Sequence, residues 1–159
     1  KVNVATCPGS NCNNGVGILP YGEMRRKNVS IVLGNDSFGY DMLEEARRFS
    51  FIQSLREKRP SAFSDDGVRM LFETNPSVAS GLFGKPLGRI EREYCADLIV
   101  FDSKFLGDGV SSLESRAISD VMVNGEWVIE DKGLVNTDVE EKLLSFEPSE
   151  AFRHNRYLR

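Results

Sequence analysis

Asp36 is the residue of this sequence that is best placed for metal or proton chemistry. It follows a β-branched, almost continuously apolar stretch, residues 29–33, within Leu33-Gly34-Asn35-Asp36-Ser37. In parallel α/β folds, functional groups collect at the carboxyl ends of the strands, where the following loops form the open face of the sheet. A carboxylate there can bind a metal ion or accept a proton from a metal-bound water. The position alone leaves a second interpretation open, in which Asp36 only caps the next helix or turn.

Ser10 and Asn11 lie at the equivalent end of the preceding predicted strand, in Pro8-Gly9-Ser10-Asn11. Both side chains could therefore face the same opening as Asp36. The alternative is an ordinary Gly-Ser-Asn loop without a function, and the residue types by themselves favour that alternative.

The sequence supplies one good metal ligand and no more. Its single histidine, His154, lies in a polar tail, whereas a hydrolytic metal centre needs several histidine or carboxylate ligands around one ion. The three cysteines, Cys7, Cys12 and Cys95, are an odd number without a repeated spacing, so they predict neither a disulfide framework nor a zinc ribbon. A reducing cytoplasm suits them best.

The elements that must position these residues predict an α/β fold. Residues 2–6 and 29–33 are expected to be strands, and residues 18–26 and 41–58 helices, which gives two strand-then-helix units and hence parallel strands. Further helices are expected over residues 65–74 and 77–83.

The second half of the chain has a different pattern. Residues 96–102 are expected to form a strand, and residues 118–124 and 127–130 flank Asn124-Gly125, a common signature of a tight hairpin. A last helical turn is expected at residues 140–144, before the polar tail that starts at Pro148.

Composition excludes two classes of partner. The formal net charge is −4, with lysine and arginine scattered among acidic residues, so there is no basic face for nucleic acid. No stretch is apolar for long enough to span a bilayer, and we therefore expect no membrane insertion.

Taken together, these segments resemble the C-terminal part of the amidohydrolase superfamily, in the branch of cytosine, guanine and S-adenosylhomocysteine deaminases and chlorohydrolases. The resemblance covers about residues 1–135. Two segments resemble barrel motifs: Cys7-Pro8-Gly9-Ser10-Asn11 is similar to Pro-x-Ser-Asn after barrel strand seven, and residues 29–37 are similar to the strand-eight motif that ends in Leu-Gly-Thr-Asp-Gly. Residues 74–82 are similar to the helix that leaves the barrel. The small β domain is matched by residues 87–91, 96–100 and 121–129.

The resemblance implies three regions. Residues 1–83 would hold strands seven and eight of a (β/α)8 barrel, the last two βα units, with their following helices. Residues 84–135 would be the C-terminal part of a small β domain, and residues 136–159 a helical turn and polar tail. The rest of the barrel would lie upstream of Lys1, with the remaining metal ligands, so this chain alone is expected to be inactive.

The resemblance also implies a reaction. Asp36 would be a ligand of a divalent metal, Zn or Fe, and the catalytic proton shuttle, while Ser10, Asn11 and Ser37 would line the substrate pocket. The complete enzyme would hydrolyse a carbon–nitrogen bond and deaminate an amino-substituted heterocycle. Two alternatives stay open: a chlorohydrolase-type hydrolase of the same branch, or a non-catalytic assembly module. Because a quarter barrel leaves strand edges uncovered, the isolated chain is expected to form homo-oligomers or aggregates.

Three residues depart from the family pattern. Asn35 replaces a threonine, Ser37 replaces a glycine next to the proposed metal ligand, and Glu93 stands where a glycine usually precedes the Ala-Asp strand. The first two alter the expected pocket, and the third predicts a different turn.

Overall fold

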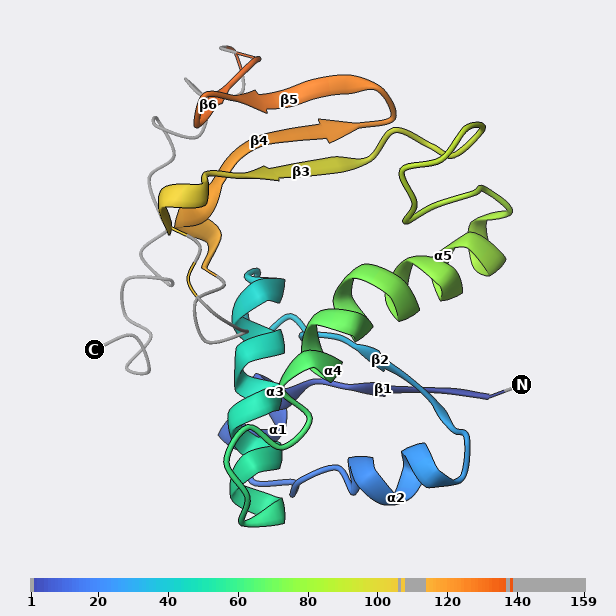
Figure 1. The fold of residues 1–159 in the computed structure, drawn as a ribbon, viewed down its shortest axis with the longest axis vertical. Helices are drawn as coiled ribbons and strands as arrows, with labels where there is room; N and C mark the ends of the chain where they lie inside the picture. The colour runs from blue at the N-terminus through green and yellow to red at the C-terminus, as the bar shows by residue number, and fades with distance from the viewer. Residues whose placement is uncertain (1, 106, 108–113, 137, 139–159) are drawn as a thin grey trace, which may run out of the picture.

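The computed structural model describes residues 2–105, 107, 114–136 and 138, and it contains two sheets. A parallel pair of strands is surrounded by helices, and a four-stranded antiparallel sheet forms the other part of the molecule (Figure 1). The α/β class expected from the sequence is therefore present. The helical turn expected at residues 140–144, the tail and His154 lie outside the described residues.

The parallel pair consists of β1, Asn3–Thr6, and β2, Ser30–Leu33. Their register pairs Thr6 with Leu33, and the Gly34 amide donates to the Thr6 carbonyl at 2.8 Å, so both strands end at the same edge. Ile31 and Leu33 are buried, whereas Ser30 and Val32 are half-buried. The parallel pairing that the strand-then-helix pattern predicted is confirmed.

Helix α1, Pro8–Asn14, starts almost at once after β1, where the sequence had favoured a loop; that prediction was wrong. Pro8 occupies the first turn, where its fixed φ suits a helix and its missing N–H is no loss. Gly15 ends the helix in the left-handed conformation, with φ 64°. The sequence favoured a loop here because glycine, serine and asparagine have poor helix propensity.

Helix α2, Tyr21–Arg26, is shorter than the expected 18–26, because its N-cap is Pro20. Tyr21 packs edge-on against Phe49 and Phe63, with ring centroids 4.9 and 5.0 Å away. Burial, followed by the charge of the nearby Asp66 carboxylate, raises the pKa of Tyr21 to about 12.

Helix α3, Met42–Glu57, confirms the expectation for residues 41–58. Asp41 is its N-cap and accepts hydrogen bonds from the amides of Leu43 and Glu44, at 2.9 and 3.0 Å. Its apolar residues Leu43, Ala46 and Phe49 are buried, whereas Leu55, near its end, is 74% exposed.

A continuous helical segment replaces the two helices expected at 65–74 and 77–83. It comprises α4, Ser64–Arg69, a π-helical turn η1, Met70–Thr74, and α5, Asn75–Phe83. Pro76 falls between the two expected ranges, yet it lies in the first turn of α5, after the widened turn, where a missing amide is tolerated. Gly67 permits the close approach of α4 to α3: a Cβ there would lie 2.6 Å from the Ala46 carbonyl oxygen.

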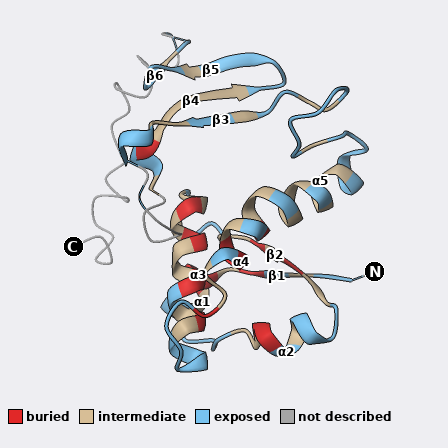
Figure 2. Ribbon diagram, viewed as in Figure 1, coloured by how far each residue is buried: buried red, intermediate tan, exposed pale blue. Residues whose placement is uncertain are grey.

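The main core lies where these helices cover the parallel strands (Figure 2). Its buried residues come from α2, β2, α3 and the start of η1: Tyr21, Ile31, Leu33, Ala46, Phe49 and Met70. None of the helices in the described part of the chain combines the length and hydrophobicity that a bilayer crossing requires.

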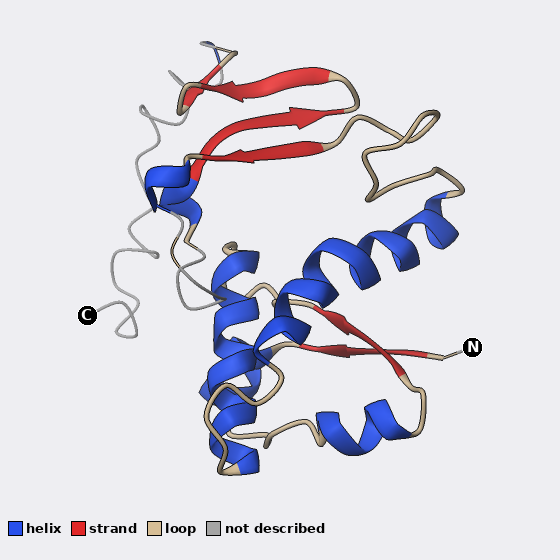
Figure 3. Ribbon diagram, viewed as in Figure 1, coloured by secondary structure: helices blue, strands red, loops and turns tan. Residues whose placement is uncertain are grey.

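The second sheet is an antiparallel meander in the order β3-β4-β5-β6 (Figure 3). Its strands are β3, Leu98–Phe101; β4, Ile118–Val123; β5, Glu126–Glu130; and β6, Gly133–Leu134. β3 is shorter than the expected 96–102, and β6 was not predicted. The expected hairpin between β4 and β5 is confirmed, with positive φ at both Asn124 and Gly125. Glu93, in the place of a family glycine, has φ 70°, the conformation that glycine adopts most easily.

Candidate functional site

Ser10 and Asp36 meet at the carboxyl ends of β1 and β2. The Ser10 hydroxyl donates a hydrogen bond of 2.7 Å to Asp36 Oδ2, across 26 residues of sequence. Ser10 is buried in the first turn of α1, whereas Asp36 is exposed in the loop after β2. The buried hydroxyl therefore fixes one oxygen of an accessible carboxylate, and Oδ1 is the atom left for a ligand.

Asn14 extends this contact by one step along α1. Its Nδ2 donates to the Ser10 oxygen at 3.1 Å, so the hydroxyl accepts one hydrogen bond while it donates another to Asp36. Ser10 and Asn14 share a face of the helix because they are four residues apart. The four-residue spacing is present in the sequence, but it places two side chains on one face only in a helix, and this segment was expected to be a loop.

The loop that carries Asp36 has an unusual backbone. Asp36 and Ser37 both have φ 54°, in the left-handed region that non-glycine residues seldom adopt. Asn35 stabilises the turn: its carbonyl accepts from the Phe38 amide at 3.0 Å, and its side-chain amide donates to the Gly39 carbonyl. Ser37 thus adopts the conformation of the glycine it replaces in the family pattern, and it is exposed next to Asp36.

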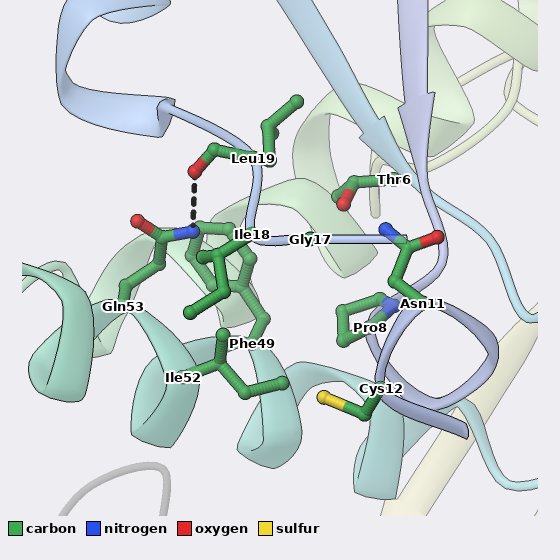
Figure 4. A pocket seen from close by; sticks show the side chains of 10 residues that line it. All are labelled: Thr6, Pro8, Asn11, Cys12, Gly17, Ile18, Leu19, Phe49, Ile52 and Gln53. Carbon is green, nitrogen blue, oxygen red and sulfur yellow. Dashed lines mark hydrogen bonds between the residues drawn. The ribbon is translucent and has the colours of Figure 1, made fainter. Parts of the chain in front are cut away.

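Asn11 lies on another side of α1 from Ser10. Its side chain lines a cavity of about 10 Å³ between α1 and α3, with Cys12, Phe49 and Gln53 among the other lining residues (Figure 4). This volume suffices for about one water molecule. Gln53 donates from Nε2 to the Leu19 carbonyl at 3.0 Å, while its buried Oε1 has no protein partner among the described residues.

Cys7 lies between β1 and α1, close to the two carboxylates of Asp36 and Glu45. Burial raises the pKa of its thiol, and the charges of Asp36 and Glu45 raise it further, against a smaller lowering by a hydrogen bond from the Asp36 backbone. A thiol with a raised pKa is a weak nucleophile at neutral pH. Cys7 is therefore a packing residue of this site.

Glu45 is a residue of this region that the sequence did not indicate. Its side chain is 1% exposed, and its Oε2 accepts a hydrogen bond of 2.8 Å from the Gly9 amide. Arg48 Nη1 lies 2.6 Å from the other carboxylate oxygen. The separation of 36 residues between Gly9 and Glu45 left no local signal for this contact.

Comparisons with known proteins place this geometry in context. No protein-family model matches the chain. It is 28% identical over 156 residues to a 5-methylthioadenosine/S-adenosylhomocysteine deaminase of Syntrophomonas wolfei, covering 90% of this chain and 36% of that protein. It is likewise 28% identical over 155 residues to a 5'-deoxyadenosine deaminase of Methanopyrus kandleri, covering 89% and 36%. The chain resembles the deaminases of the amidohydrolase superfamily.

Solved structures agree with the amidohydrolase resemblance at the level of the fold. A zinc-bound adenosine deaminase of Xanthomonas campestris superposes with a TM-score of 0.74 at 23% identity, over 90% of this chain and 35% of that one. An amidohydrolase of Brucella melitensis gives a TM-score of 0.67 at 20% identity, over 89% and 34%. A zinc complex of atrazine chlorohydrolase from Arthrobacter aurescens gives 0.66 at 20%, over 90% and 34%. The chain spans about a third of the length of the curated relatives and solved structures that it matches.

The residues of this amidohydrolase-like chain fit a metal only in part. Among the residues that the structure describes, no group of three or more histidine, cysteine, aspartate or glutamate side chains could hold an ion. Asp36 can supply a single carboxylate oxygen, which is one ligand of the several that a hydrolytic centre needs. The described part of the chain could therefore supply at most one ligand to a metal and does not form a metal site by itself.

Proposed function

We propose that this chain is the C-terminal part of a metal-dependent amidohydrolase that hydrolyses a carbon–nitrogen bond and deaminates an amino-substituted heterocycle. The observation that carries the proposal is the 2.7 Å contact between Ser10 and Asp36, at the carboxyl ends of two parallel strands. In α/β enzymes of the barrel type, catalytic residues come from this end of the strands. The curated relatives named as deaminases support the reaction type.

The proposed division of the chain follows from the same resemblance. β1 and β2 would be barrel strands seven and eight, within residues 1–83, which also hold the helices that follow. Residues 84–135 would form the C-terminal part of a small β domain, and residues 136–159 a helical turn and tail. The parallel register of β1 with β2 and the separate antiparallel meander support this division.

A divalent metal, zinc or iron, would supply a polarised water as the nucleophile. Asp36 would be one of the ligands of that metal. Its carboxylate would also accept a proton on the attacking side and donate one to the leaving nitrogen. Ser10, through its hydrogen bond, holds the Asp36 carboxylate in one orientation.

The proposed substrate contacts belong to three residues. Ser37 is exposed beside Asp36 and offers a hydroxyl to the substrate. Ser10 would contribute from α1, although its hydroxyl proton is directed to Asp36. Asn11 would also contribute from α1, but from the side of the helix that faces the small cavity against α3. An amino-substituted heterocycle suits such a set, since its ring nitrogens and amino group are hydrogen-bonding groups.

The chain alone would be inactive, and its partner would be the N-terminal portion of the barrel. That portion would pair with the outer edges of β1 and β2, because a closed barrel leaves no strand edge, and would bring the other metal ligands. Without it, we expect self-association through the uncovered strand edges. The free cysteines are consistent with a cytoplasmic location.

The test uses the whole protein in which this chain occurs. We expect an intact mass well above 17.8 kDa, about one equivalent of transition metal, and release of ammonia from an adenosine-type substrate. Asp36→Asn should lower this activity by about 10³-fold or more, because it removes both a ligand and a proton carrier. Asp65→Asn, an exposed aspartate at the start of α4, is the matched control and should leave activity unchanged.

Other outcomes would select the alternatives. Release of chloride from a chlorinated heterocycle without ammonia release would indicate a chlorohydrolase. A stable, metal-free protein that binds another protein and hydrolyses neither class of substrate would indicate an assembly module. An intact mass near 17.8 kDa with no metal would exclude catalysis by this chain alone.

A further inference from the structure

We infer that Glu45 is a positioning residue of the proposed site, which caps helix α1 from outside and so holds Ser10 against Asp36. The inference deepens the proposed function and rests on it for its effect on activity. Glu45 itself lies on α3, and it touches neither Ser10 nor Asp36 by hydrogen bond.

Helix α1 lacks the cap that its N-terminus needs. The first amides of a helix have no intrahelical partner, and the N-cap side chain normally accepts from one of them. The N-cap of α1 is Cys7, which makes no side-chain capping bond. Intrahelical bonding starts with the Asn11 amide, which donates to the Cys7 carbonyl at 2.8 Å, so the Gly9 amide must find an acceptor elsewhere.

Glu45 provides that acceptor. Its Oε2 accepts from the Gly9 amide at 2.8 Å, at the position where an N-cap side chain usually bonds. A carboxylate is favoured there because the amino end of a helix carries partial positive charge. The carboxylate is 1% exposed, which makes its bond to the amide strong and its loss hard for water to replace.

The surroundings of Glu45 are arranged for this contact. Arg48 Nη1 lies 2.6 Å from Oε1, so the buried charge is paired and both carboxylate oxygens are bonded. Gly9 leaves room for the carboxylate: a Cβ at that position would lie 2.4 Å from Glu45 Oε1 and 3.1 Å from the Phe38 ring. Glu45, Arg48 and Phe38, which belongs to the Asp36 loop, thus all lie against Gly9.

The hydrogen bond between Glu45 and Gly9 affects the proposed catalytic residue Asp36 through Ser10, the next residue along the chain. Gly9 directly precedes Ser10, and the Ser10 hydroxyl reaches Asp36 Oδ2 at 2.7 Å. The helix that is fixed at Gly9 has only seven residues, so its own hydrogen bonds can hold it only weakly. Fixing its first turn therefore fixes the orientation of Ser10.

Glu44 offers a matched control on the same helix. Arg48 Nη2 donates to Glu44 Oε1 at 2.6 Å, but the Glu44 side chain is 46% exposed, and the Gly9 amide donates to Glu45 instead. Loss of Glu44 removes an ion pair from Arg48 and leaves the cap in place.

The experiment compares Glu45→Ala, Glu45→Gln and Glu44→Ala in the whole protein, by hydrogen exchange of residues 7–14 and by steady-state kinetics. We expect Glu45→Ala to accelerate exchange in this segment about tenfold, as for the loss of one buried cap. Its kcat should fall by about tenfold or more at unchanged metal content. Glu45→Gln keeps an oxygen for the Gly9 amide and should restore part of both losses, whereas Glu44→Ala should change neither by more than about twofold.

The exchange and kinetic measurements separate two kinds of failure. Unchanged exchange of residues 7–14 in Glu45→Ala, or equal acceleration in Glu44→Ala, would overturn the positioning role whatever the activity. If Glu45→Ala does not fold, the other two variants decide. Equal exchange rates of residues 7–14 in Glu45→Gln and Glu44→Ala would overturn the positioning role, and faster exchange in Glu45→Gln alone would support it. An unmodified protein that releases no ammonia would refute the proposed function, while exchange alone would still decide whether Glu45 caps α1.

Discussion

Asn75 binds both backbone groups of Leu33, the last residue of β2. Its Oδ1 accepts from the Leu33 amide at 2.9 Å, and its Nδ2 donates to the Leu33 carbonyl at 2.7 Å. One side chain at the start of α5 thus takes the place of a neighbouring strand at the end of β2. The contact ties the helix to the edge that leads into the Asp36 loop.

Replacement of Asn75 should therefore destabilise the protein. Asn75→Ala leaves two backbone groups of Leu33 without a partner, and we expect a loss of about 2 kcal/mol in the free energy of unfolding. Asn75→Asp keeps the acceptor and loses the donor. Its loss in the free energy of unfolding should therefore be smaller at low pH than at neutral pH, because the protonated carboxyl can again donate a hydrogen bond. Denaturant unfolding at neutral and acid pH measures both, and equal stability of Asn75→Ala and the unmodified protein would contradict the assignment.

Two helical glycines should respond to alanine in opposite directions. Gly67→Ala would place a methyl group 2.6 Å from the Ala46 carbonyl oxygen, and separation of α4 from α3 should lower the free energy of unfolding by about 1–3 kcal/mol. Gly81→Ala, in α5, meets nothing within 4 Å and should raise it by about 0.5–1 kcal/mol. Thermal unfolding of both variants checks the pair, and a stabilised Gly67→Ala would show that the two helices do not pack this closely.

Tyr21 predicts a loss of stability in alkaline solution. Burial and the Asp66 carboxylate raise the pKa of Tyr21 to about 12 in the folded protein, whereas the unfolded chain has an ordinary value of about 10. The folded state therefore holds the phenol proton more tightly. Its contribution is complete below pH 10 and is lost as the pH rises through 12, to a total of at most about 3 kcal/mol.

Two phenylalanine variants isolate this effect. Tyr21→Phe should remove the steepest part of the stability loss between pH 10 and 12, together with the late tyrosinate absorbance at 295 nm. Tyr40→Phe is the control because Tyr40 is 95% exposed, and it should change neither. Ionisation of Tyr21 at the same pH as the exposed phenols would contradict its burial beside Asp66.

Ser10→Ala tests the hydrogen bond to Asp36 in the proposed active site. Without the hydroxyl, the exposed carboxylate loses its fixed orientation, and we expect kcat/KM for ammonia release to fall by about tenfold to a hundredfold. Asn14→Ala removes the bond that orients Ser10, together with an exposed hydrogen bond from Asn13, and should have a smaller effect. Retained activity in Ser10→Ala would show that Asp36 acts independently of this contact.

The amino-acid sequence by itself determined the class of the fold and the order of most elements. Two successive strand-then-helix patterns predicted the parallel pair β1 and β2 and helix α3, because parallel strands need such a connection between them. Asn124-Gly125 predicted its hairpin because few residues tolerate positive φ at both positions. The motif around Asp36 also carries part of the amidohydrolase resemblance.

Tertiary structure alone decided how the candidate site is assembled. The segment from Pro8 to Asn14 has weak intrinsic helix propensity, and the carboxylate that caps it comes from Glu45, 36 residues later. Pro76 argues locally for a break, yet a π turn carries the helix through it, at the point where Asn75 reaches Leu33. Local patterns cannot encode such contacts, because their energy exists only after distant segments have been brought together.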